Sequence, residues 1–134
     1  MQINKRVYKD KEGNGISVEK WGELFENFSY RVVKQEKIAD KFISTMWIGV
    51  PQLVIDSKGI RFSGYFGTGI FNVDGKLEEE RRYETLQEAE KGHLETVTNE
   101  KFNALRNGNP EDLERIWANQ ALNYKLLFAI CLYL

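Results

Sequence analysis

The run from Arg82 to Asn107 constrains the fold of this chain most, because it predicts a strand that leads directly into a long helix. Thr85 fits the N-cap position, where its hydroxyl accepts a hydrogen bond from a backbone N–H one turn later. Glu88 follows three residues on and can bond back to the N–H of the cap, which completes a capping box. We therefore expect the helix to cover one face of a β-sheet. The residues at the helical spacing of that side are Leu86, Ala89, Glu90, His93, Leu94 and Val97.

Several stretches before this helix have the composition of β-strands. The run from Phe42 to Val50 is rich in β-branched and aromatic residues and has apolar side chains on both alternating faces, which predicts a central strand covered on both sides. Asp74-Gly75 is a strong hairpin signal. The charged run after it, Leu77 to Tyr83, has the composition of an edge strand. We also expect strands at residues 1–9, 28–36, 52–55, 60–66 and 69–73.

Helices are expected on both sides of this set of strands. Ser17 is placed to cap an amphipathic helix over residues 18–27. Gly108 is placed to end the long helix, and Asn109 followed by Pro110 predicts the start of a further one. The apolar stripe of that last helix is formed by Leu113, Ile116, Trp117, Ala121, Tyr124, Leu127, Phe128 and Cys131.

These elements together predict one α+β domain over residues 1–134, a length sufficient to bury a core. The expected architecture is an antiparallel sheet of four to five strands, with the N-terminal helix and two C-terminal helices packed on it. Residues 109–134 would form a C-terminal helical extension of this domain.

Charge and cysteine content exclude several classes of protein. The formal net charge is -1, so the total charge gives no attraction to nucleic acid. Nucleic-acid binding is not expected beyond a local patch of Lys58, Arg61, Tyr65 and Phe66. A single cysteine, Cys131, forms no internal disulfide, which is typical of a reducing compartment. No apolar run reaches the length of about 20 residues that a membrane span needs. We expect a protein of the cytoplasm.

Residue types that carry catalysis or bind metals are scarce. One histidine, His93, and one cysteine cannot build a zinc site of the usual kinds. The run from Asp10 to Gly15 has the spacing of the start of a calcium loop, but Trp21 occupies the place of its last glutamate ligand. The run from Gly64 to Gly69 lacks the ending of a phosphate loop. We expect no catalytic residues, no metal and no cofactor, so the chain is more typical of a binding protein than of an enzyme.

Two motifs resemble a family of small, uncharacterised phage and prophage proteins. They are Ile43-Ser44-Thr45-Met46-Trp47-Ile48-Gly49 and Tyr83-Glu84-Thr85-Leu86-Gln87-Glu88-Ala89-Glu90-Lys91-Gly92-His93. The family carries an xSTxWxG strand, a second strand rich in aromatics and a YxTxxEAxxGH strand-to-helix joint, preceded by a short helix with a Trp, as Trp21 is here. The resemblance covers residues 18–97 and departs after Gly49, where Val50-Pro51-Gln52 replaces a frequent Asp-His pair. It implies a phage or prophage origin and no established activity.

Three functions remain open on these grounds. The leading one is a non-enzymatic binding protein that contacts a protein partner in the host cell, for example as a counter-defence factor. The second is a small-molecule-binding or hydrolytic protein with a pocket formed by Trp47, Tyr65, Tyr83 and His93. The third is a structural or assembly component of the virion. The apolar C-terminus predicts either burial within the chain or a homodimer contact, through Leu126, Leu127, Phe128, Ile130, Leu132 and Leu134.

Overall fold

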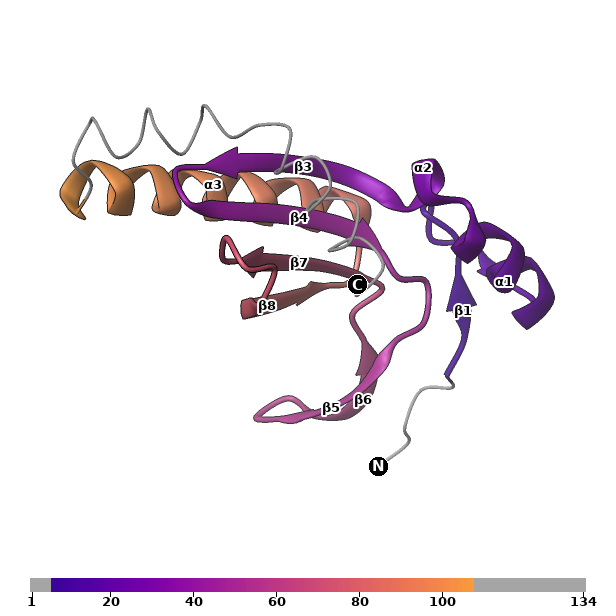
Figure 1. Ribbon diagram of the computed structural model, residues 1–134. Coiled ribbons are helices and arrows are strands. Elements are labelled where there is room, and N and C mark those ends of the chain that lie inside the picture. The colour runs from indigo at the N-terminus through magenta and orange to yellow at the C-terminus, as the bar shows by residue number, and fades with distance from the viewer. Residues whose placement is uncertain (1–5, 108–134) are drawn as a thin grey trace.

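The computed structural model describes residues 6–107, and the predicted α+β class with an antiparallel sheet is confirmed (Figure 1). The central sheet has four antiparallel strands in the order β3-β4-β7-β8, and two further pairs, β1-β2 and β5-β6, stand apart from it. The elements are β1 (Tyr8–Lys9), β2 (Gly15–Ile16), α1 (Val18–Glu26), α2 (Phe28–Arg31), β3 (Val32–Ile38), β4 (Lys41–Trp47), β5 (Gln52–Asp56), β6 (Gly59–Ser63), β7 (Phe66–Phe71), β8 (Leu77–Tyr83) and α3 (Leu86–Asn107). The helix and the interface expected over residues 109–134 lie outside the described residues.

The two inner strands carry the core, as the apolar composition of residues 42–50 predicts. β7 pairs with β4 along its whole length, from Phe71 opposite Phe42 to Phe66 opposite Trp47. Alternation sends Ile43, Thr45 and Trp47 to one face of the sheet and Phe42, Ser44 and Met46 to the other. Every one of these six residues is fully buried, which is typical of a strand covered on both faces.

The start of α3 follows the predicted cap with one difference. Thr85 Oγ1 accepts the N–H of Glu88 at 3.2 Å, and the Glu88 carboxylate accepts the N–H of Glu84 at 3.0 Å rather than that of Thr85. The helix follows β8 after two residues, so the chain passes from the edge strand onto the face of the sheet without a loop. α3 packs on β3, β4, β7 and β8, and Val97 joins Ile43 and Ile70 in one core cluster.

The side of α3 that faces the sheet is made mostly of small and polar residues. Its buried members are Ala89, Gly92, His93, Thr96 and Val97. The expectation that Leu94 faces the sheet is wrong, because that side chain is 64% exposed. The buried positions recur at spacings of three and four residues from Ala89, and Leu94 falls one residue after His93, outside this series. Glu90 is likewise exposed.

Helix α1 packs at one end of the sheet rather than across its face. Ser17 caps it by accepting the N–H of Lys20 at 3.1 Å. Its aromatic and aliphatic side contacts a cluster centred on Trp47, and the indole of Trp21 donates to the carbonyl of Ile48 at 2.8 Å. The prediction of a strand from residue 28 is wrong for its first four residues, which form α2. Asn27 explains this difference, because its side chain accepts the N–H of Tyr30 and starts a new turn.

The prediction of a single strand over residues 60–66 is also wrong, because two strands share this range. The chain leaves β6 at Ser63 and enters β7 at Phe66, and Gly64 between them has φ +95°, a conformation that glycine adopts without strain. The strands β5 and β6 therefore form a separate two-stranded ribbon that projects from the sheet (Figure 1).

Candidate functional site

A buried polar chain lies between α3 and the sheet. The hydroxyl of Thr45 is 2.5 Å from that of Thr68 and 2.6 Å from Nδ1 of His93. On the other side of the imidazole, Nε2 lies 3.4 Å from the carboxylate of Glu36. Hydroxyl, imidazole and carboxylate thus stand in the order that nucleophilic catalysis uses.

The position of this chain of groups in the core argues against catalysis. Thr45 has no exposed surface and His93 is 2% exposed, so a substrate has no route to either group. Burial lowers the pKa of His93, although the negative charge of Glu36 opposes this. Partial burial raises the pKa of Glu36, but Lys34 and His93 outweigh that effect and leave the pKa below its ordinary value. A neutral imidazole here stabilises the packing of α3 on the sheet.

Among residues 6–107, the four residues of the expected pocket do not line one common cavity. Trp47, Tyr65 and Tyr83 meet in one aromatic cluster, where the Trp47 indole donates to the carbonyl of Lys9 at 2.9 Å. His93 belongs to the polar chain instead. Of the four, Tyr65 lines the cleft described next.

A cleft of about 470 Å³ lies between the β1-β2 turn and the start of α3. Charges of both signs line it, together with the first residues of the helix and the aromatic side chain of Tyr65. Its lining includes Lys9, Asp10, Lys11, Glu12, Tyr65, Glu84, Thr85 and Gln87. The volume lies within the range of small-molecule sites, about 300–1,000 Å³.

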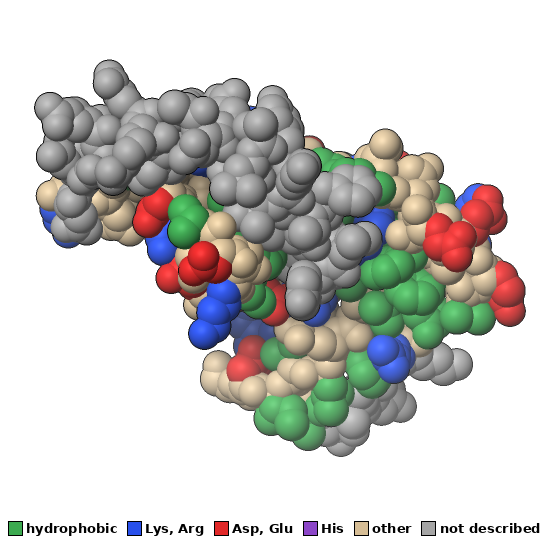
Figure 2. All heavy atoms as spheres, in the orientation of Figure 1, with side chains coloured by type: hydrophobic (Ala, Val, Ile, Leu, Met, Phe, Trp, Pro, Cys, Tyr) green, Lys and Arg blue, Asp and Glu red, His purple; other side chains and the backbone are tan. Residues whose placement is uncertain are grey.

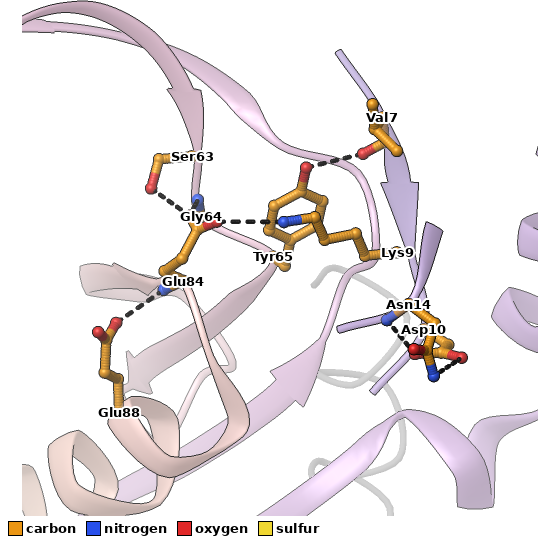
Figure 3. A network of polar contacts seen from close by, with 9 residues as sticks. All are labelled: Val7, Lys9, Asp10, Asn14, Ser63, Gly64, Tyr65, Glu84 and Glu88. Carbon is orange, nitrogen blue, oxygen red and sulfur yellow. Dashed lines mark hydrogen bonds and ion pairs between the residues drawn. The ribbon is translucent and has the colours of Figure 1, made fainter. Parts of the chain in front are cut away.

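Glu84 organises one wall of this cleft (Figure 3). Its carboxylate accepts the hydroxyl of Ser63 at 2.6 Å and lies 3.6 Å from the ammonium of Lys9. That ammonium stands 4.7 Å from the ring centroid of Tyr65, whose hydroxyl donates to the carbonyl of Val7 at 2.8 Å. Burial and the charge of Glu84 raise the pKa of Tyr65. The network fixes the base of the β5-β6 ribbon to the joint between β8 and α3.

The ribbon itself presents an apolar face. Leu53 pairs with Phe62 and Ile55 pairs with Ile60, and residues directly opposite in an antiparallel pair share a face. Leu53 is 52% exposed and Ile55 is 72% exposed. Figure 2 shows hydrophobic side chains at the lower end of the molecule, where Figure 1 places β5 and β6. We call these four residues the ribbon face.

Sequence reasoning missed Glu84 and the ribbon face as candidates. The signal for the ribbon face is the alternation of Leu53 and Ile55, matched by Ile60 and Phe62 across the turn at residues 56–59. No local pattern marks Glu84, because its partners Lys9 and Ser63 are distant in sequence.

Two classes of site find no support in the described part of the chain. Within residues 6–107, no three His, Cys, Asp or Glu side chains are grouped so that they could hold a metal ion. No helix in this range combines the length and apolar character needed to cross a bilayer.

Comparison with known proteins identifies no relative. No family model, no curated protein and no solved structure matches the chain. The resemblance to the phage family therefore stays a prediction, and the functional argument depends on the structure.

The motif residues of that resemblance meet in three dimensions. Thr45 of the first motif bonds His93 of the second. Gly92 lies so close to Tyr83 that an added Cβ would stand 2.2 Å from the tyrosine ring. These contacts of the two motifs thus hold α3 on the sheet.

Proposed function

We propose that this chain is a non-enzymatic binding protein that contacts a protein partner through the ribbon face. The observation that carries this proposal is the exposure of Leu53 and Ile55 on a ribbon that stands outside the four-stranded sheet. Exposed apolar side chains grouped in this way are typical of interaction surfaces.

The backbone of the ribbon can also take part in binding. β5 and β6 pair only with each other among the described strands, so each has an outer edge available for hydrogen bonds to an extended segment. Addition of a strand to such an edge is a common mode of peptide recognition, in which the backbone gives affinity and side-chain contacts give specificity. We therefore infer a partner that presents an extended segment with apolar residues at alternate positions.

The sequence resemblance supports the setting of this function. It favours a phage or prophage origin, so the partner would be a host or phage protein met in the host cytoplasm, and a counter-defence role fits this setting. The buried state of His93 and Thr45 supports the non-enzymatic part of the proposal.

The test places a photo-crosslinking amino acid at Ile55 and identifies the captured protein by mass spectrometry. The affinity of the purified partner is then measured for the wild type and for Ile55→Glu. We expect Ile55→Glu to weaken binding by at least about tenfold, because a charge replaces an apolar contact at the centre of the interface.

Gln52→Glu is the matched control, since it adds the same charge at an exposed position that alternates to the opposite side of the ribbon. It should bind as the wild type does. Equal affinities for Ile55→Glu and the wild type, with both variants folded, would contradict the proposal.

The cleft supports a second candidate, a small-molecule-binding protein. Its volume of about 470 Å³ and its lining by Lys9 and Glu84 suit a compact ligand that carries both a negative and a positive group. A thermal-shift screen of such compounds tests this. A compound that stabilises the wild type should no longer stabilise Lys9→Met. The same compound should still stabilise Lys76→Met, a control whose substituted residue is not part of the cleft lining. Equal stabilisation of both variants would exclude the cleft as the site.

A further inference from the structure

The face of the sheet opposite α3 is buried although no described helix lies across it. Phe42 and Met46 have no exposed surface, and Phe71 keeps 1%. Gln35 points to the same face, where its amide donates to the hydroxyl of Ser44 at 2.9 Å. We call Phe42, Ser44, Met46 and Phe71 the second face.

The described helices are placed elsewhere. α3 is on the other face, as the contact of His93 with Thr45 and the cluster of Val97 with Ile43 establish. α1 and α2 lie at one end of the sheet, where α2 contacts β3 and β4. Within residues 6–107, no helix therefore accounts for the burial of the second face.

The chain outside residues 6–107 offers two segments, and they differ in length. Residues 1–5 are too few to cover four strands, whereas 27 residues follow Asn107. As a helix, residues 110–134 would be about 37 Å long, more than the roughly 20 Å of a six-residue strand. Only the longer segment matches the size of the second face.

The sequence of this segment fits the task. Asn109 and Pro110 are the start signal of a helix, and the apolar stripe that begins at Leu113 continues to Cys131. The last turns of α3 extend past the turn between β3 and β4 (Figure 1), and Phe102 and Leu105 there are exposed. The chain therefore clears the end of the sheet before Gly108, a residue suited to reversing its direction.

We propose that residues 110–134 form an amphipathic helix that docks on the second face of its own chain, so that the sheet lies between two helices. The apolar stripe of Leu113, Trp117, Tyr124, Leu127 and Phe128 packs on Phe42, Met46 and Phe71. The C-terminus in this arrangement completes the core and is not a free surface for another protein.

The first experiment uses the two methionines, Met1 and Met46, and the single cysteine of the full-length chain. Cys131 is replaced by Ala, and a nitroxide is attached at Ala118→Cys or, in a second variant, at Ala129→Cys, both opposite the stripe. With ¹³C-methyl methionine, we expect the Met46 resonance to lose most of its height in at least one variant. The same loss has to be absent when the nitroxide is carried by a second, isotopically unlabelled chain.

A second measurement needs no cysteine substitution. Photo-methionine in place of methionine crosslinks Met46 to its neighbours, and mass spectrometry maps the products. Crosslinks to residues 110–134 within a monomer support the proposal. Crosslinks between chains, broadening confined to the mixed sample, or neither signal at Met46 would overturn it.

Discussion

The four-stranded sheet and the β5-β6 ribbon contain similar apolar residues, but the sheet buries them and the ribbon exposes them. In the sheet, Ile43 has no exposed surface, because α3 packs over it. In the ribbon, Ile55 is 72% exposed and its strand has one neighbour. An isolated two-stranded ribbon is marginally stable on its own, and this one is fixed at its base by Glu84. The difference separates the part of the molecule that stabilises the fold from the part available for contact.

The largest expected difference in stability between the sheet and the ribbon is seen when one isoleucine of each is replaced by alanine. Ile43→Ala should lower the free energy of unfolding by about 2–5 kcal/mol, because it leaves a cavity in the core. Ile55→Ala makes the same chemical change on the ribbon face and should alter it by less than about 0.5 kcal/mol. Urea unfolding of both variants measures this. A large loss for Ile55→Ala would mean that the ribbon is part of the core.

A smaller change in stability is expected when a glycine in α3 or in α1 is replaced by alanine. An added Cβ at Gly92 of α3 would meet the Tyr83 ring at 2.2 Å, whereas at Gly22 of α1 it would meet nothing within 4 Å. Gly92→Ala should therefore destabilise the protein by about 1–3 kcal/mol, despite the better helix propensity of alanine.

Gly22→Ala is the matched control and should stabilise the protein by about 0.5–1 kcal/mol, since propensity acts there without a clash. If α3 packs closely on the sheet, thermal unfolding should show a lower Tm for Gly92→Ala and a higher Tm for Gly22→Ala than for the wild type. Two shifts of the same sign would contradict the close contact of Gly92 with Tyr83.

The smallest expected effect is a pH dependence carried by His93. Burial lowers its pKa in the folded state below the unfolded value of 6.5, so the unfolded state binds the proton more readily. Stability from this group is therefore complete above pH 6.5 and is lost as the pH falls from there towards the folded pKa. The Tm should decline from about pH 7 to about pH 5, and it should decline less in His93→Gln.

Glu36, which faces the imidazole, contributes below this window. Its folded pKa is lower than its ordinary value of 4.5, so its contribution is lost only as the pH falls below 4.5. A His93→Gln variant with the full pH dependence of the wild type would show that another group is responsible.

The sequence predicted the sheet-to-helix joint well, because local chemistry decides it. Thr85 and Glu88 act within one turn, and the alternation of residues 42–47 alone indicates a strand with two buried faces. The exposed position of Leu94 could not be read in the same way, because hydrophobicity favours burial and the sheet instead receives Gly92 and His93. That choice depends on close packing and on a hydrogen bond to Thr45, which is 48 residues away.

The candidate surfaces were harder to predict than the fold. The expected pocket relied on aromatic residues, and Trp47 and Tyr83 are in fact part of the core cluster. The cleft depends on pairs such as Lys9 with Glu84, which come together only when the chain has folded. The ribbon separates from the sheet at Gly64, whose positive φ no strand propensity indicates.

The position of the ribbon outside the core has a consequence for the evolution of this protein. Substitutions at Leu53 and Ile55 leave the packing of α3 on the sheet unchanged, so these positions are free to vary without loss of the fold. Thr45, Gly92 and His93 have no such freedom, because each is in contact with the opposite layer. Substitutions should therefore be tolerated more readily at Leu53 and Ile55 than at these three residues.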